Sequence, residues 1–222
     1  MTNEPQIFNP LPQLISFLFG FLTAIFAEPL RQLIFRPTLK VQFGESEDYL
    51  SLTPEEIQVN DKSSKIKAYY IRVKVTNIRR AVAKDCKVYL VNVEKEDDNG
   101  KFKPTIYCDY IPLAWSCQNM GEQYRGIDLN KGVNQFADVI TTREISSVFY
   151  PPLKLFPFRY QEIFSQKGTF RFTVQVTSAN TEPKTIKIVF HWDGKWDKFQ
   201  VYSRKGRVRH QISKIIIMAL GF

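Results

Sequence analysis

The stretch Ala68-Tyr-Tyr-Ile-Arg-Val-Lys-Val-Thr76 alternates between apolar and polar side chains. A period of two residues is typical of a β-strand with one face in a core. We therefore expect an inward face made of Tyr69, Ile71, Val73 and Val75. The run from Lys84 to Val93 has the same pattern, with Cys86, Val88 and Leu90 as its expected inward set.

Alternating runs of this kind recur through most of the chain. They are separated by turn-forming segments, and no strand-helix-strand spacing is seen, which favours two packed antiparallel sheets. We expect an immunoglobulin-like β-sandwich of about seven strands at 37–200, with a short hairpin within 44–65. The run 149–158 contains three prolines and is predicted to be a long loop. The other expected strands lie at 38–43, 102–109, 135–141, 169–177 and 185–192.

One part of this pattern resembles a known family. Ile71-Arg-Val-Lys-Val-Thr-Asn77, Ala83 and Cys86-Lys-Val-Tyr-Leu90 are similar to the hairpin "V-x-V-x-N-x-G-x-x-x-A-x-x-V-x-V-x-L" of immunoglobulin-like modules of the CARDB type, the cell-adhesion-related domain found in bacteria. The turn at 127–132 and the strand at 168–176 resemble further parts of that family, although Arg79 or Arg80 stands where its first turn has glycine. The resemblance covers about 65–195. It implies a spacer or binding platform, with no catalytic residues to transfer.

The first 36 residues have a different character. No charge occurs from Pro5 to Ala27, and 11–30 would form a helix of about 30 Å, the thickness of a bilayer core. We predict a transmembrane helix here; a buried core helix is the alternative, and a cleaved signal peptide lacks its basic start. The residues expected within the span include Leu14, Phe17, Phe21, Ile25 and Phe26.

The positive charges predict which side of the membrane the sandwich occupies. Lys and Arg follow the apolar stretch and do not precede it, which predicts a single-pass protein of the cell inner membrane with a cytoplasmic C-terminal domain. The three cysteines, without a C-x-x-C pattern, agree with a reducing compartment.

The last residues, 201–222, form a basic and apolar tail. More than half of the net charge of +9 lies there, so a nucleic-acid surface on the sandwich is disfavoured. The tail either meets anionic lipid or packs on protein. The residues expected to contact a membrane surface or another anionic partner are Arg31, Arg36, Arg204, Lys205, Arg207 and Arg209.

The sequence contains no recognisable catalytic motif. His191 and His210 are the only histidines, and neither stands beside a nucleophile in a known pattern, so we expect no enzyme, no cofactor and no metal. A hydrolase would have to depend on His191 or Asp109. If a ligand or protein surface exists, aromatic residues in irregular segments are its expected site, because tyrosine and tryptophan give large contact areas. These residues are Trp115, Tyr150, Phe158, Trp192 and Trp196.

Two functional hypotheses follow. The first is a membrane-anchored, non-enzymatic module that binds a protein or small ligand next to the lipid bilayer. The alternative is a membrane effector, in which the sandwich senses a ligand and the helix forms a homo-oligomer through Gly20 and Ala24 to perturb the membrane.

Overall fold

The computed structural model describes residues 15–18, 20–21, 23, 25–27, 36–44, 46–59, 62–119 and 121–203. The chain divides into two units, Met1–Arg36 and Pro37–Phe222. The predicted span residue Leu14 lies outside the described residues, as does the tail from residue 204 onward. The same holds for the predicted contact residues Arg31, Arg204, Lys205, Arg207 and Arg209.

In the first unit, the described residues from 15 to 27 are helical. The rings of Phe17 and Phe21 stack with centroids 6.3 Å apart, and the hydroxyl of Thr23 donates to the carbonyl of Gly20 at 3.0 Å. Within the described part of the chain, no helix is both long and apolar enough to cross a membrane. The described residues therefore give the predicted span no support, and it stays a prediction.

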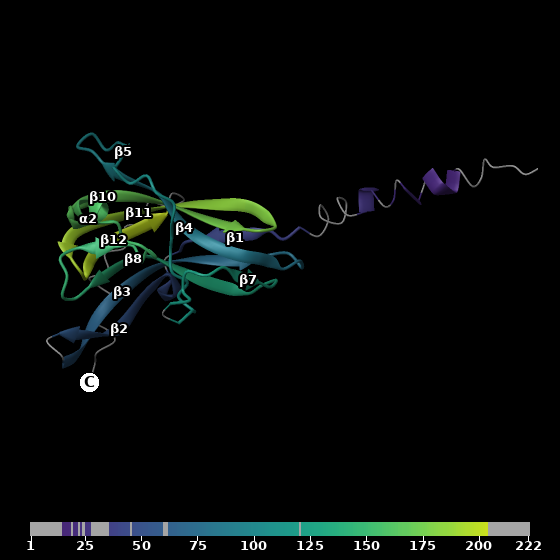
Figure 1. Cartoon of the computed structure of the whole chain (residues 1–222). Coiled ribbons are helices and arrows are strands. Elements are labelled where there is room, and N and C mark those ends of the chain that lie inside the picture. The colour runs from purple at the N-terminus through teal and green to yellow at the C-terminus, as the bar shows by residue number, and fades with distance from the viewer. Residues whose placement is uncertain are drawn as a thin grey trace, which may run out of the picture. The chain divides into compact units, whose positions relative to one another are not determined.

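The second unit is built from two antiparallel sheets that form a sandwich-like arrangement (Figure 1). The five-stranded sheet has the order β1-β3-β8-β9, with β2 paired to β3. Its strands are β1 (Leu39–Gln42), β2 (Leu50–Val59), β3 (Lys62–Asn77), β8 (Asn134–Arg143) and β9 (Phe149–Tyr150).

The seven-stranded sheet has the order β12-β11-β10-β4-β5, with β6 and β7 also paired to β4. Its strands are β4 (Ala83–Glu96), β5 (Phe102–Pro104), β6 (Ile111–Pro112), β7 (Ile127–Leu129), β10 (Gly168–Ser178), β11 (Thr181–Lys195) and β12 (Lys198–Ser203). Three short helices occur in the described part of this unit: η1 (Glu47–Tyr49), η2 (Phe158–Tyr160) and α2 (Gln161–Ser165).

The core lies between the facing sides of the sheets. Tyr69, Ile71, Val73 and Val75 of β3 are buried, as are Cys86, Val88 and Leu90 of β4, so the inward faces predicted from the alternation are confirmed. Phe170, Phe172, Val174 and Val176 repeat the pattern on β10. Burial of one face of each strand is the main force that holds the sheets together.

Several details differ from the sequence prediction. β3 and β4, expected as a hairpin, belong to different sheets, so 78–82 crosses from one sheet to the other. The strand expected at 102–109 ends at Pro104, where the backbone amide and the hydroxyl of Thr105 both donate to the carbonyl of Val93. The hairpin within 44–65 is longer than expected, and β12 continues to Ser203, past the predicted boundary at 200.

One ion pair across the second sheet carries a pH prediction. Arg171 and Glu94 lie opposite each other on β10 and β4, and two hydrogen bonds of 2.6 Å join the guanidinium to the carboxylate. These hydrogen bonds to Arg171 lower the pKa of Glu94. A lowered folded-state pKa means that the stabilisation is present above the ordinary value of about 4.3 and is lost as the pH falls through the folded value.

We expect Glu94→Gln to lower the free energy of unfolding by about 1 kcal/mol at neutral pH, with the difference from wild type shrinking below about pH 4. Urea unfolding of both proteins from about pH 7 to about pH 3 measures this. The matched control is Glu122→Gln, because the Glu122–Arg125 pair is exposed and should contribute little. A difference between Glu94→Gln and wild type that is the same at every pH would contradict the assignment.

Candidate functional site

A pocket of about 770 Å³ lies on the face of β3 and β8 that points away from the core. On these strands the side chains alternate, so the residues between the core residues line the pocket. Segment 148–158 and α2 form its other side. The polar pocket-lining residues from the strands are Thr53, Tyr70, Arg72, Asp138, Thr141, Arg143 and Tyr150.

A β-bulge places one charged pair in this pocket. Ile71 lies opposite Ile140 and Arg72 lies opposite Asp138, so Val139 is an extra residue in β8. Because of this insertion, Ile140 packs in the core while Asp138 turns to the pocket side beside Arg72. The Nε of Arg72 donates to Oδ1 of Asp138 at 2.8 Å, and the hydroxyl of Ser116 donates to the same oxygen at 2.6 Å.

The carboxyl group of Asp138 is largely buried from solvent. Burial raises its pKa, and the contacts with Ser116 and Arg72 act in the opposite direction. Its side chain is 10% exposed. A carboxylate in this position is satisfied by Arg72 and Ser116, and so it serves first to orient the guanidinium of Arg72.

Arg143 supplies a second charged group to the pocket. The Nε of Arg143 is 2.5 Å from Oε2 of Glu55, and the hydroxyl of Tyr70 donates to Oε1 of the same carboxylate. The guanidinium of Arg143 also stacks on the ring of Tyr150, 4.7 Å from the ring centroid. Stacking and pairing together fix the plane of this guanidinium.

Two hydroxyl groups in the pocket wall have no hydrogen-bond partner among the described residues. They are Oγ1 of Thr141 and the phenol oxygen of Tyr150. Burial raises the pKa of Tyr150, so its hydroxyl keeps its proton and can donate. Buried polar groups in folded proteins nearly always have partners, so these two hydroxyls are available to bond to a molecule in the pocket.

Most of the rest of the pocket is apolar, although Gln123 and Gln161 also line it. Phe156 packs against Phe164 of α2 with ring centroids 5.5 Å apart, and the hydroxyl of Tyr124 donates to the carbonyl of Leu153 at 3.1 Å. Apolar walls with a few placed polar groups are typical of small-molecule sites. The side chains of this wall are Val148, Phe149, Pro151, Pro152, Leu153, Phe156, Phe158 and Phe164.

The predicted surface aromatics divide into two groups. Trp115 and Trp192 are 1% and 0% exposed, so these two are core residues and the prediction that they belong to a surface is corrected. Trp196 is partly buried and stacks on Tyr69 at 5.5 Å. Tyr150 and Phe158 both line the pocket, and the structure brings these two together.

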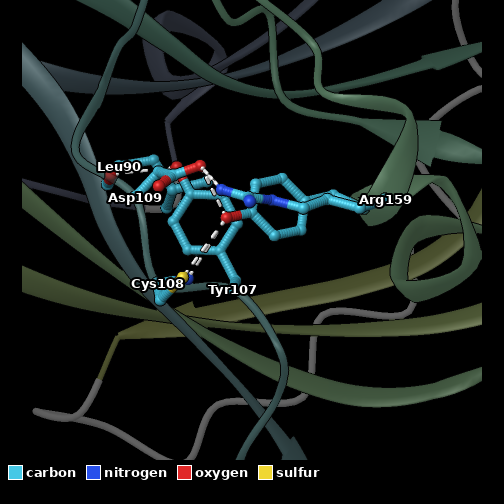
Figure 2. A network of polar contacts seen from close by, with 6 residues as sticks. Leu90, Tyr107, Cys108, Asp109 and Arg159 are labelled. Atoms are coloured by element: carbon cyan, nitrogen blue, oxygen red, sulfur yellow. Dashed lines mark hydrogen bonds and ion pairs between the residues drawn. The ribbon is translucent and has the colours of Figure 1, made fainter.

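A second polar network surrounds Asp109 (Figure 2). Its carboxylate accepts hydrogen bonds from the hydroxyl of Tyr160 at 2.6 Å and from the guanidinium of Arg159. Tyr160 and Arg159 lower the pKa of Asp109. The thiol of Cys108 lies 3.6 Å from the Tyr160 hydroxyl, and Tyr107 donates to the carbonyl of Leu90 at 3.1 Å. These contacts hold residues 107–109 against η2. Because the pKa of Asp109 is lowered, its carboxylate is a poor proton acceptor.

The remaining predicted residues have ordinary surroundings. His191, on β11, has its Nδ1 3.1 Å from the hydroxyl of Thr169 on β10, which is a cross-strand contact. Arg36 is exposed. Cys86, Cys108 and Cys117 are free thiols. In the part of the chain that the structure describes, no three His, Cys, Asp or Glu side chains gather as metal ligands would.

Known proteins give no further guide to the site. No protein-family model matches this chain, and no curated protein is significantly similar to it. The pocket itself offers a ligand two fixed guanidinium groups, two buried hydroxyls and an aromatic wall.

Proposed function

We propose that this chain is a non-enzymatic binding module, anchored by a single N-terminal helix in the cell inner membrane, whose cytoplasmic sandwich binds a partner molecule. The observation that carries the proposal is the pocket on β3 and β8, with its buried hydroxyls of Thr141 and Tyr150 and its apolar wall. A rigid sheet that presents fixed polar groups in an apolar hollow is suited to recognition.

The sandwich is proposed to be an immunoglobulin-like module of the CARDB type. Asn77 stands at the asparagine of the motif that this family shares, and its side chain is fully buried. It bonds to the backbone of residues in the connection 78–82 and in β7. A structural asparagine at the end of a strand gives a physical reason for such a motif position.

The absence of catalysis is supported by what holds the acidic groups. Asp138 and Glu55 are paired with Arg72 and Arg143, and Asp109 is paired with Arg159. A general base needs a free lone pair and a pKa near the working pH. Carboxylates that are occupied by guanidinium groups are better suited to positioning than to proton transfer.

The membrane anchor is supported by the sequence. A charge-free run from Pro5 to Ala27 precedes Arg31 and Arg36. A lysine at the centre of a membrane helix costs about 3 kcal/mol. We expect the full chain to sediment with membranes through a carbonate wash, the 37–222 fragment to stay in solution, and Phe21→Lys to weaken sedimentation while Phe21→Leu does not.

Protease added to spheroplasts tests the side of the membrane. Protection of the sandwich is expected, because the basic residues follow the apolar run. A full chain that stays in solution would overturn the anchor. An anchored but digested sandwich would place the binding module outside the membrane and would overturn the cytoplasmic assignment.

A further inference from the structure

The polar end of the pocket is built on one rung of the first sheet. Thr141 on β8 and Tyr150 on β9 are directly opposite each other, so their side chains lie on the same face. Thr141 is 1% exposed, and neither hydroxyl has a hydrogen-bond partner among the described residues. Two neighbouring hydroxyls can therefore donate to one acceptor in the pocket.

Arg143 lies two residues further along β8 and thus on the same face as Thr141. Its contact with Glu55 uses Nε, and a guanidinium has four more N–H donors on its terminal nitrogens. The ring of Tyr150 supports the guanidinium plane from one side. Hydroxyl donors next to an oriented guanidinium are the groups that bind a planar oxyanion, and a carboxylate fits this geometry with paired hydrogen bonds.

The remaining walls of the pocket indicate the size and polarity of the rest of the ligand. Leu153, Phe156 and Phe158 are apolar, and the volume of about 770 Å³ suits an organic molecule and not an inorganic ion. Arg143 and Arg72 are paired with Glu55 and Asp138, so the site has no excess positive charge. Each negative charge on a ligand adds repulsion from these carboxylates, which favours one negative charge over two.

We infer that this pocket binds an organic monoanion, a carboxylate on an apolar body, with the oxyanion held by Arg143, Thr141 and Tyr150 and the body against Phe156 and Phe158. The inference rests on the proposed function, since it names the ligand class of the same binding module. Charge and hydrogen bonding determine specificity where the oxyanion binds, and the shape of the pocket determines it where the apolar body of the ligand binds.

The test uses 2-naphthylacetate and its neutral analogue 2-naphthylacetamide as probes. Isothermal titration of the full chain in non-ionic detergent, with a detergent blank, measures both affinities. We expect the acid to bind at least about tenfold more tightly than the amide, because hydrogen bonds to charged groups are stronger than those to neutral groups. Arg143→Gln and Thr141→Val should each remove most of that preference and leave amide binding nearly unchanged.

Arg79→Gln is the matched control, because Arg79 is exposed and does not line the pocket. It should bind both probes as wild type does. Thermal unfolding of each variant shows whether it is folded, and Tyr150→Phe, which removes only the hydroxyl, is the substitute if Arg143→Gln unfolds.

Equal affinities for acid and amide would overturn the oxyanion inference and leave the pocket as a binding site. No binding of either probe by a folded protein would overturn the inference and also the choice of this pocket. Failure of the membrane anchor would appear in the sedimentation assay, where these probes have no part.

Discussion

We expect Asn77→Ala to lower the free energy of unfolding of the sandwich by about 3 kcal/mol. This is the largest effect that we expect from the loss of a single polar side chain. The side chain is 0% exposed. Its Nδ2 donates to the carbonyls of Ala81 at 2.6 Å and Leu129 at 2.9 Å, and its Oδ1 accepts from the amides of Arg79 at 3.1 Å and Thr38 at 3.4 Å.

The size of this effect follows from what alanine leaves behind. Each lost hydrogen bond contributes about 1 kcal/mol, and each buried carbonyl left without a partner adds a further penalty. Asn77 also links four separate parts of the chain: the segment before β1, the end of β3, the connection 78–82 and β7. The connection 78–82 is where the chain passes from one sheet to the other, so the loss weakens the joint between the sheets.

Urea unfolding of Asn77→Ala and Asn134→Ala measures the prediction. Asn134 is exposed, and its side chain accepts one hydrogen bond, from Thr76 at 2.6 Å. Its replacement should change stability by no more than about 0.5 kcal/mol. If both variants unfold at the same urea concentration with the same slope, the buried amide does not have the role assigned to it.

The sequence predicts the core better than it predicts the pocket. Alternation identifies the inward side chains of β3 and β4 because burial of one strand face imposes a period of two on the residue types. The same alternation assigns Tyr70 and Arg72 to the outside, and in that it is correct. It cannot show that segment 148–158 lies beside them and turns this outer face into a pocket.

The charged pairs were not predictable for a related reason. Arg72 and Asp138 are 66 residues apart in sequence, and they meet only because β3 pairs with β8. The register of that pairing includes a bulge at Val139, and a one-residue shift would reverse the faces. In the sequence, the only indication that the carboxylate of Asp138 is buried is the apolar run in which it lies.

The short strands were also not predicted from the sequence. β6, β7 and β9 have two or three residues, too few to show any period. Phe149 was assigned to a proline-rich loop, but it pairs with Thr142 as part of β9 and is fully buried. The prolines that follow end the strand without preventing it, since Pro151 comes directly after Tyr150.

Phe149→Ala should be the most destabilising apolar substitution that we propose, with a loss of about 4 kcal/mol. The Phe149 ring belongs to the first sheet but contacts the second sheet and α2. Its neighbours are the rings of Phe164, Phe170, Phe172, Phe190 and Trp192, with centroids 5.6, 5.1, 6.1, 4.9 and 5.6 Å away. Truncation leaves a cavity that five rigid rings cannot close, so the cost of the cavity adds to the transfer free energy that is lost with the ring.

Graded variants separate packing from other causes. Phe149→Leu retains most of the volume and should lose clearly less than Phe149→Ala, whereas Phe158→Ala, at a ring that is 86% exposed, should stay within about 0.5 kcal/mol of wild type. Urea unfolding measures all three. Because Phe149 is followed by Tyr150, the same core position also holds the pocket hydroxyl in place, and Phe149→Leu should weaken probe binding even where it remains folded. Equal stability of Phe149→Ala and Phe158→Ala would show that this ring does not join the two sheets.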